Sequence, residues 1–311
     1  MRQQPPLLLG TSAAITKVLN LCARYARTPD PIVLLGQRGT GKTALAGLIH
    51  SWSQRPGEIV EESAAALPKD MEIARLCGHV KGAFTDARDD RPGLMEAAHR
   101  GTFFLDEVQL SSAQLQGVLL RLLEKSSIRR IGDVRERPVD VRLVVASNQD
   151  LSQLVAHGSF RADLLDRFGC MSVRLPRLAD RKDDVIPLAQ QFLEQAAAEL
   201  GHVEPPIMSE PMQALLLASS WPGNIRQLRS VCRTALALAT PRVLLGVEDL
   251  PHEFVAPLGD LGRARYSKAA EREDRVRDAL ARVEGNRAAA ARLLGVSRQT
   301  LYRWLEEDRP A

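Results

Sequence analysis

The chain has 311 residues, of which 45% are apolar and 26% charged, and a formal net charge of +4, which is ordinary for a soluble globular protein of two or three domains. The four cysteines lie far apart and form no pair at metal-ligand spacing, which argues against a zinc site or a disulfide framework and favours a reducing, cytoplasmic location. No signal peptide is recognisable, and no run approaches the ~18–20 apolar residues of a membrane span, which argues against a secreted or membrane protein.

The first half of the chain alternates short apolar runs with helical patterns. The runs are Ile32–Leu35, Thr102–Leu105 and Val141–Ala146. Strands that read as continuous apolar runs, separated by helices, are typical of a parallel sheet covered on both faces. We therefore expect residues 1–175 to form an α/β domain.

A phosphate-binding loop follows the first run. The segment from Gly36 to Thr43 fits the P-loop pattern and lies between an apolar strand and a helix that begins near Lys42. Its glycines let backbone N–H groups face phosphates, while Lys42 is expected to reach the β- and γ-phosphates and the Thr43 hydroxyl to hold Mg²⁺. The expected cofactors are therefore ATP and Mg²⁺. The expected nucleotide-binding residues of the loop are Gly36, Gln37, Arg38, Gly39, Thr40, Gly41, Lys42 and Thr43.

Polar residues after the next two runs complete a triphosphatase site. Asp106 and Glu107 follow the second run, at the carboxyl edge of the sheet, where ligands bind in open α/β folds. Asp106 suits the Mg²⁺ shell and Glu107 suits a general base. Asn148 follows the third run and is placed to orient the attacking water, although a cap on the next helix is an equally good interpretation.

Two arginines, Arg161 and Arg167, stand six positions apart in the segment Phe160–Arg167. On a helix their side chains would point in directions about 120° apart. On composition alone, surface salt bridges with Asp163 and Asp166 are the favoured interpretation.

Beyond Pro176 the strand pattern ends and amphipathic helices follow. They span roughly Asp183–Leu200, Ser209–Ser220 and Asn224–Ala239, and the prolines and glycines after them indicate a linker. The expected boundaries are 1–175 for the α/β domain, 176–240 for a smaller helical domain, 241–269 for the linker and 270–311 for a final helical unit.

The final unit has the pattern of a helix-turn-helix. An apolar helix stops at Gly295, and Ser297 can cap a second helix whose Leu301, Trp304 and Leu305 face inward. The N-terminal end of the second helix is expected to enter the major groove of double-stranded DNA. A basic three-helix bundle used only for oligomerisation is the alternative.

The residues of this unit divide by the part of DNA that they are expected to reach. The start of the second helix is placed for base edges, and the other basic and aromatic residues are better placed for phosphates. The expected DNA-binding residues are Ser297, Arg298, Gln299 and Thr300 at the helix start, and Arg287, Tyr302 and Arg303.

Taken in order, these motifs resemble the bacterial enhancer-binding proteins, which are AAA+ activators of sigma-54 RNA polymerase. The similarity covers nearly the whole chain, and its segments are Leu9–Ser12, the P-loop, Gly82–Ala87, Gly101–Glu107, Phe160–Arg167, Trp221–Arg226 and the C-terminal helices. The most specific element is the hexapeptide Gly-Ala-Phe-Thr-Asp-Ala, which is similar to the GAFTGA loop of that family. The final unit resembles the Fis-type domain with which these activators usually end.

The resemblance implies an AAA+ ATPase made of a nucleotide-binding subdomain and a helical lid, assembled in a ring that is usually a hexamer. Each nucleotide is then held between neighbouring subunits. By similarity, Arg161 and Arg167 are arginine fingers for the adjacent subunit, Asn148 is a first sensor and Arg226 is a second sensor. The Fis-type domain is expected to dimerise through the helix around Glu271–Arg282.

The hexapeptide is expected to contact sigma-54 and to change position with the nucleotide state. Phe84 and Thr85 occupy the places of the Phe-Thr pair that touches sigma-54 in the family. An ordinary surface loop with one half-buried ring is the alternative. The expected contact residues are Gly82, Ala83, Phe84, Thr85, Asp86 and Ala87.

The chain departs from the family pattern at three positions. Asp86 stands where the family has Gly, so a carboxylate and a Cβ enter a loop that must bend, and remodelling of sigma-54 is expected to be weakened or differently tuned. Ser63 falls nearest the place of an Asn that restrains the catalytic Glu, which bears on how hydrolysis is coupled to loop movement. Thr43 replaces a Glu that is common in the family, but Thr is the general P-loop choice.

Few residues precede Gly10, so a receiver or ligand-sensing domain is expected to be absent, with control by expression level or by a regulatory protein acting in trans. The leading interpretation is a sigma-54-dependent activator that binds enhancer DNA and uses ATP hydrolysis to remodel the closed promoter complex. A DNA-binding regulator with impaired remodelling, acting as a repressor or in a mixed ring, is the second. An AAA+ remodeller of another protein that carries a DNA anchor is the third.

Overall fold

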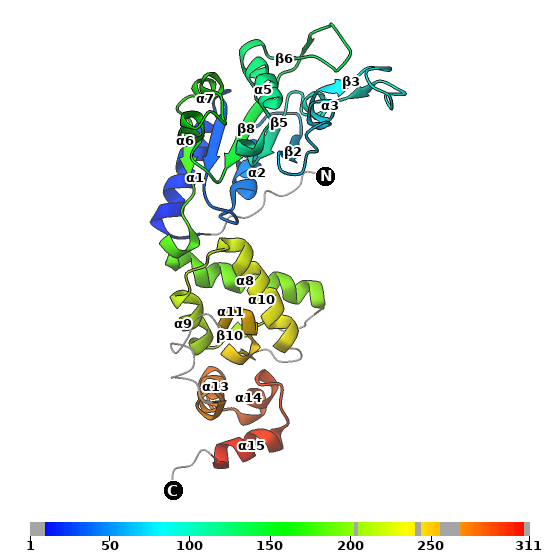
Figure 1. The fold of residues 1–311 in the computed structure, drawn as a ribbon. Coiled ribbons are helices and arrows are strands. Elements are labelled where there is room, and N and C mark those ends of the chain that lie inside the picture. Colours follow the sequence, from blue (N-terminus) through cyan, green and yellow to red (C-terminus); the bar gives the residue numbers. More distant parts are fainter. Residues whose placement is uncertain (1–9, 202–204, 240–243, 256–267, 308–311) are drawn as a thin grey trace. The chain divides into compact units, whose positions relative to one another are not determined.

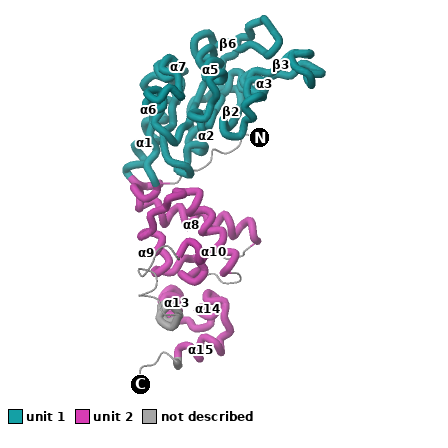
Figure 2. Tube along the Cα trace, in the orientation of Figure 1, with its two compact units in different colours: residues 1–8, 13–177 teal, residues 9–12, 178–311 magenta. Residues whose placement is uncertain are grey.

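The computed structural model describes residues 10–201, 205–239, 244–255 and 268–307, without the side chains of residues 268–274, 306 and 307. The chain divides into two compact units (Figure 2). Unit 1 comprises residues 1–8 and 13–177, and unit 2 comprises residues 9–12 and 178–311. Within the described ranges, no helix combines the length and the apolar character needed to cross a membrane.

A five-stranded parallel sheet forms the centre of unit 1 (Figure 1). Its strands lie in the order β2-β5-β8-β1-β9. Their bounds are Ile32–Leu35 for β1, Ile59–Ser63 for β2, Thr102–Asp106 for β5, Arg142–Ser147 for β8 and Ser172–Arg174 for β9. The predicted α/β class with a parallel sheet is confirmed, and because the strands are parallel, all their carboxyl ends lie at one edge.

Helices cover both faces of this sheet. They are α1 (Ala13–Tyr25), α2 (Lys42–Ser53), α3 (Glu72–Cys77), α4 (Leu94–Ala97), η1 (Val108–Leu110), α5 (Ala113–Lys125), α6 (Leu151–Ala156) and α7 (Ala162–Phe168). Phe104 of β5 packs in one core with Leu45 of α2, and Phe103 packs in the other with Leu119 of α5. Successive strand residues point to opposite faces, so the continuous apolar run of β5 fills both cores.

Two short antiparallel hairpins project from unit 1 near its upper right in Figure 1. They are β3 (Gly78–His79) with β4 (Arg91–Pro92), and β6 (Ser127–Ile128) with β7 (Arg137–Pro138). The N–H of Ile131 donates to the Gly78 carbonyl at 3.0 Å, and the Val80 N–H donates to the Ile131 carbonyl at 3.1 Å. Backbone hydrogen bonds therefore join the two hairpins.

A helical domain opens unit 2. Its elements are η2 (Leu178–Asp180), η3 (Lys182–Asp184), α8 (Val185–Leu200), α9 (Glu210–Ala218), α10 (Asn224–Ala239), η4 (Val247–Asp249) and α11 (His252–Val255). Buried apolar side chains such as Leu188, Met212 and Leu228 form its core. The N–H and hydroxyl of Ser12 donate to the buried Asp184 carboxylate at 2.8 and 2.7 Å, which ties the segment before α1 to this domain.

Residues 244–255 differ from the linker that the sequence predicts at 241–269. In this stretch β11 (Leu244–Leu245) pairs in parallel with β10 (Ile207–Met208), and η4 and α11 follow. Leu245 and Leu250 are buried in the core of the helical domain. Prolines and glycines dominate the pattern here, and the apolar residues between them show no regular period. Residues 241–243 and 256–267 of the predicted linker lie outside the described residues.

Among the described residues of unit 2, the C-terminal part consists of three helices. They are α13 (Lys268–Arg282), α14 (Arg287–Leu293) and α15 (Arg298–Glu307). Their core contains Ala279, Ala290 and Leu301, together with Leu244 of β11 and, at its margin, Ile207 of β10. The small β10–β11 sheet therefore contributes to two cores, because Met208 and Leu245 pack in the helical domain.

Candidate functional site

The P-loop connects β1 to α2 at the carboxyl edge of the sheet. Gly39 and Gly41 have φ values of 76° and 105°, a left-handed conformation that residues with a Cβ rarely adopt. The Thr40 hydroxyl donates to the Gln37 carbonyl at 2.9 Å, which closes the loop on itself. α2 begins at Lys42, so the loop leads directly into a helix N-terminus, which attracts anions.

Lys42 lies inside this loop. Its side chain is buried, and Nζ donates to the carbonyls of Gly36 and Gln37 at 2.9 and 3.1 Å. The next residue, Thr43, is exposed in the first turn of α2. The loop thus places an ammonium group and a hydroxyl group at the start of the same helix.

An acidic pair ends β5. Asp106 is the last residue of the strand, and its carboxylate accepts a hydrogen bond from the Glu107 N–H at 2.8 Å. Arg38 of the P-loop donates from Nε to Oε1 of Glu107 at 3.1 Å. Burial, and then the charge of Asp106, raise the pKa of Glu61 on the neighbouring strand β2. The structure therefore brings the P-loop into contact with the acidic pair at the end of β5.

Asn148 directly follows β8, as predicted. Its Oδ1 accepts a hydrogen bond from Nε2 of Gln109, in η1, at 3.1 Å. The cap of the next helix, α6, is Asp150 instead, whose carboxylate accepts from the Ser152 N–H at 2.9 Å. The sequence gives no signal for Gln109, because it is 39 residues away from its partner.

The two arginines of residues 160–167 lie at opposite ends of α7, and both are exposed. The sequence pattern places both arginines on one helix, but Arg161 precedes α7 as its N-cap and only Arg167 lies within the helix. Arg161 donates to both carboxylate oxygens of Asp163 at 3.0 and 2.7 Å, and this hydrogen bonding raises the pKa of Arg161. Arg167 donates to Glu124 of α5 at 3.2 Å rather than to Asp166. Composition could not identify Glu124, which lies 43 residues away.

The hexapeptide forms a closed turn between β3 and β4. The Gly82 N–H donates to the Ala87 carbonyl at 2.8 Å, and the Ala87 N–H donates to the Phe84 carbonyl at 2.9 Å. Phe84 is 37% exposed, and the centroid of its ring lies 4.8 Å from that of His79. Thr85 and Asp86 are exposed at the tip, next to Ala83, which is partly buried. The turn thus presents a hydroxyl, a carboxylate and part of an aromatic ring to solvent.

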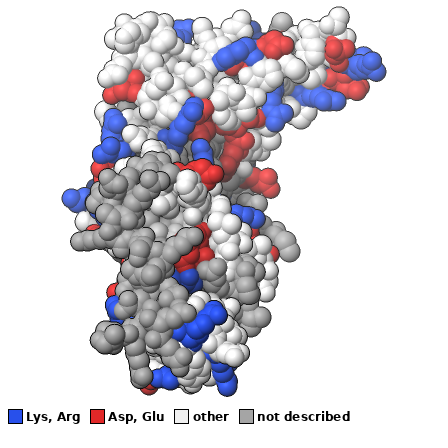
Figure 3. Space-filling view, turned by 60° about the horizontal axis from the view of Figure 1, so that its bottom comes forward, with Lys and Arg blue, Asp and Glu red and all other residues white. Residues whose placement is uncertain are grey.

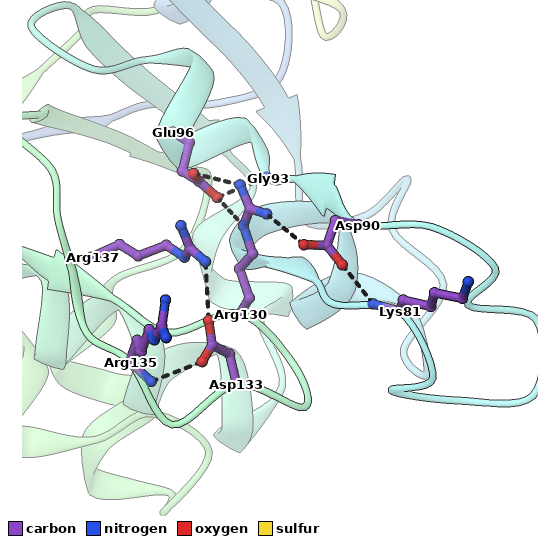
Figure 4. A network of polar contacts seen from close by, with 8 residues as sticks. All are labelled: Lys81, Asp90, Gly93, Glu96, Arg130, Asp133, Arg135 and Arg137. Atoms are coloured by element: carbon purple, nitrogen blue, oxygen red, sulfur yellow. Dashed lines mark hydrogen bonds and ion pairs between the residues drawn. The ribbon is translucent and has the colours of Figure 1, made fainter.

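A polar network holds the two hairpins together (Figure 4). Arg130, beyond β6, donates to both carboxylate oxygens of Glu96 at 2.8 Å and lies 4.0 Å from Asp90. Asp90 in turn accepts a hydrogen bond from the Lys81 N–H, next to the hexapeptide, at 2.8 Å. The hydrogen bond from Arg130 is the largest influence on Glu96 and holds the pKa of that carboxyl below its usual value. At the projecting end of unit 1, acidic and basic side chains lie side by side (Figure 3).

The predicted second sensor, Arg226, lies on α10 of unit 2 and is exposed. The helix start is fixed by Asn224, which is buried and accepts a hydrogen bond from the Leu178 N–H at 2.8 Å. Trp221, just before it, is buried and donates to the Leu216 carbonyl at 2.9 Å. The local structure therefore accounts for the tryptophan and asparagine of this motif, and the role of Arg226 stays a prediction.

The C-terminal helices have the predicted helix-turn-helix geometry. Gly295 has a φ of 63° at the turn, and the Ser297 hydroxyl accepts a hydrogen bond from the Thr300 N–H at 3.0 Å as the cap of α15. Leu301 is buried, whereas Arg298, Gln299, Tyr302 and Arg303 are exposed. The Arg287 guanidinium lies 5.3 Å from the centre of the Tyr302 ring. The predicted DNA-binding residues therefore lie at the start and on the exposed side of one short helix, with Arg287 beside it.

Three parts of the chain match families of known proteins. Residues 8–174 match the family described as the sigma-54 interaction domain, and residues 179–262 match the AAA+ ATPase lid domain. Residues 273–307 match the Fis family of bacterial regulatory proteins. These matches confirm the AAA+ and helix-turn-helix classes predicted from the sequence. The lid match includes residues 244–255, of which Leu245, Val247 and Leu250 are buried in the core of the helical domain.

Similar proteins are found among characterised proteins and among solved structures. Regulatory protein AtoC of Escherichia coli K12 is 36% identical over 315 residues, which is 96% of this chain and 67% of AtoC. The DNA-binding transcriptional regulator NtrC of the same strain is 34% identical over 96% of this chain and 70% of NtrC. NtrX from Brucella abortus in complex with ADP matches with a TM-score of 0.74 and 29% identity, over 97% of this chain and 69% of NtrX. NtrX from the same organism in complex with ATP matches with a TM-score of 0.72 and 30% identity, over 98% of this chain and 70% of NtrX.

Proposed function

The chain belongs to the family of sigma-54-dependent transcriptional activators, and from this premise we propose that it hydrolyses ATP in a ring, usually a hexamer in this family, to remodel the closed complex of sigma-54 RNA polymerase. One observation carries the proposal. A P-loop joined to an acidic strand end and a solvent-exposed Phe-Thr turn belong to the same compact unit. Its place of action is the bacterial cytoplasm, where DNA and the polymerase are found.

The nucleotide site supports ATP with Mg²⁺. In this proposal Lys42 and the N–H groups of the loop bind the phosphates, and the hydroxyl of Thr43 and the carboxylate of Asp106 are oxygen donors of the kind that Mg²⁺ prefers. Bound Mg²⁺ supplies charge neutralisation at the phosphates. Glu107 is the carboxylate placed to accept the proton of the attacking water, and Asn148, held by Gln109, orients that water.

Two exposed arginines and one lid arginine complete the proposed ring site. Arg161 and Arg167 exchange their carboxylate partners for the γ-phosphate of a neighbouring subunit, where a guanidinium stabilises charge that spreads over the phosphoryl oxygens. Both arginines are available for such an exchange because ion pairs at the surface are weakened by solvent and contribute little to stability. Arg226 acts as the second sensor from the lid.

The hexapeptide supplies the proposed contact with sigma-54. Phe84 offers part of an apolar ring and Thr85 a hydroxyl at the tip of a turn that its own backbone hydrogen bonds hold closed. The network of Arg130 fixes this turn against the second hairpin. A displacement of the second hairpin would therefore be transmitted to the turn.

The helix-turn-helix supplies the proposed contact with enhancer DNA. Arg298, Gln299 and Thr300 are placed to read base edges in the major groove, and Arg287 and Arg303 to contact phosphates. Exposure of this end of α15 supports that assignment.

The test mixes the purified chain with sigma-54, without nucleotide and with an ADP–metal fluoride mimic of the transferring phosphate. We expect a stable complex only with the mimic, and its loss in Phe84→Ala and in Thr85→Ala. Met71→Ala is the matched control, because Met71 is an exposed apolar side chain of the same unit, and that variant should retain the complex. If ATP is hydrolysed but no complex forms, the sigma-54 assignment fails and another protein is the substrate of remodelling.

Asp86 favours a second candidate function, a DNA-binding regulator with impaired remodelling. Its carboxylate lies exposed at the tip of the contact turn, where desolvating a charge against a partner is costly. A large gain in promoter opening by Asp86→Gly would support this candidate. An unchanged level of opening would favour the activator, with Asp86 as a tolerated residue.

A further inference from the structure

Arg38 and Glu107 connect the phosphate-binding loop to the proposed general base. Nε and Nη2 of Arg38 both lie 3.1 Å from Oε1 of Glu107. The arginine side chain is 66% exposed and the glutamate side chain 18%, so the guanidinium lies mainly in solvent while the carboxylate is largely enclosed. Glu107 has φ and ψ values of 52° and 41°, which are uncommon for a residue with a side chain. The carboxylate is therefore held in a restricted place by a charge that belongs to the P-loop.

Ser63 lies beside the acidic pair, and its observed hydrogen bonds are to its neighbours in the sequence. Ser63 is the register partner of Asp106 on the adjacent strand, one residue from Glu107. Its hydroxyl accepts a hydrogen bond from the Ala65 N–H at 3.3 Å, and its N–H donates to Glu62 at 3.1 Å. The N–H and the hydroxyl oxygen of Ser63 are thus hydrogen-bonded to neighbours in the sequence, while Arg38 contacts the carboxylate of Glu107.

We propose that Arg38 is a positioning residue that exchanges the carboxylate of Glu107 for a phosphate of the bound nucleotide. Carboxylate and phosphate oxygens both accept hydrogen bonds from the guanidinium fork, and the phosphates of a nucleotide carry more charge. Arg38 is the third residue of the P-loop, and Glu107 follows the end of β5. Glu107 and the proposed phosphate site therefore lie at the same carboxyl edge of the sheet. Phosphate binding therefore frees Glu107 to accept a proton. The inference rests on the proposed ATP site and adds a link between nucleotide binding and the release of the base.

The test is a double-mutant cycle on nucleotide affinity, which requires no hydrolysis. The dissociation constant of a fluorescent ADP is measured for the wild type, Arg38→Ala, Glu107→Gln and the double variant. If the exchange occurs, Glu107→Gln should tighten ADP binding, because it releases the guanidinium of Arg38 to the phosphates. The gain in affinity should be at least threefold larger in the background that keeps Arg38 than in the Arg38→Ala background, which has no guanidinium to release. The same cycle with Arg38→Gln guards against a folding defect of the alanine variant.

The other outcomes overturn the exchange. Equal gains in the two backgrounds would mean that Arg38 contacts phosphate independently of Glu107. A smaller gain with Arg38 present would mean that Arg38 stays on Glu107 and merely shields its charge. If the wild type does not bind the nucleotide at all, the proposed ATP site fails, and that result is distinct from either of these.

A matched control pair is formed by Glu62 of β2 and Arg75 of α3. Arg75 donates to Glu62 at 2.7 Å, with side chains 59% and 12% exposed, so it is also a half-enclosed arginine–glutamate pair. Neither residue belongs to the P-loop or to the acidic strand end. The cycle of Arg75→Ala and Glu62→Gln should leave ADP affinity within twofold of the wild type in every variant.

Discussion

A buried arginine closes the end of a helix in unit 1. Arg142, at the start of β8, is 2% exposed, and burial lowers its pKa. Its guanidinium donates to the carbonyls of Tyr25 and Ala26 at 2.7 and 2.8 Å, and also to that of Thr28. The last carbonyls of a helix have no partner within the helix. At the scale of the residue, a charge in the sheet therefore serves as the C-terminal cap of α1.

His50, in α2, gives the stability a dependence on pH. Its Nδ1 lies 2.8 Å from the Thr102 hydroxyl. Burial, and then the charge of Arg55, lower its pKa from 6.5. The native state therefore binds a proton less readily than the unfolded state, so this contribution is complete above about pH 6.5 and is lost as the pH falls towards the lowered pKa.

We expect the free energy of unfolding in urea to fall between about pH 7.5 and pH 5, and to fall less steeply in His50→Gln. The exposed His157→Gln variant is the control and should keep the slope of the wild type. Equal slopes for His50→Gln and the wild type would contradict the assignment.

At single residues, the sequence predicts motifs whose geometry is local. The curled P-loop and the Ser297 cap lie where the pattern places them, because glycine conformations and capping depend on neighbours within a few residues. Partners from distant positions are missed. Gln109 and Glu124 reach Asn148 and Arg167 only because the fold brings η1 and α5 to these sites.

At the scale of elements, the packing of the two hairpins depends on Gly132. Its φ is 79°, and a Cβ there would lie 2.9 Å from the Cβ of Ala83 in the hexapeptide. Gly132→Ala should therefore push the hexapeptide out of place and reduce the complex with sigma-54 about tenfold or more, while ADP affinity stays unchanged. Complex formation in the presence of the ADP–metal fluoride mimic is the measurement.

Gly158→Ala is the matched control for this change. Gly158 has a φ of 71° but open space around its Cβ position, so alanine costs only the left-handed strain, about 1–2 kcal/mol. Both variants carry the left-handed strain, and only Gly132→Ala, which adds the contact with Ala83, should lose the complex. Loss of the complex in both variants would mean that reduced stability, and not the contact between the hairpins, causes the effect of Gly132→Ala.

Within the five-stranded sheet, the strands that the sequence analysis does not predict are the two at its edges. β2 reads Ile-Val-Glu-Glu-Ser and β9 only Ser-Val-Arg, so neither shows the continuous apolar run of β1, β5 and β8. An edge strand has one neighbour and is less enclosed, and its sequence carries a weaker signal. Glu61 is an example, because it lies on the unpredicted strand β2. The charge of Asp106 contributes to its raised pKa, and the sequence does not predict that these two residues are close.

At the scale of the whole molecule, DNA binding should separate into two measurable parts. Arg298→Ala should remove about 1–3 kcal/mol of discrimination at one base position, because that residue opens α15, at the end that we propose enters the major groove. Arg303→Ala should weaken binding to all sequences and reduce the slope of log K against log salt by about 1. Titrations of an enhancer fragment and of random DNA at several salt concentrations test both. Identical behaviour of the two variants would contradict the assigned roles.

The small sheet of β10 and β11 limits where the chain can be shortened. Leu244 is fully buried and Ile207 is partly buried, and both pack in the core of the three C-terminal helices. Arg282 of α13 also donates to the Met208 carbonyl at 3.2 Å. A protein ending near residue 262 would lose these helices and present two aliphatic side chains to water, a surface that favours nonspecific association. The sedimentation coefficient of such a fragment would then reflect nonspecific association as well as ring assembly. The number of subunits in the ring is therefore best measured on the intact chain.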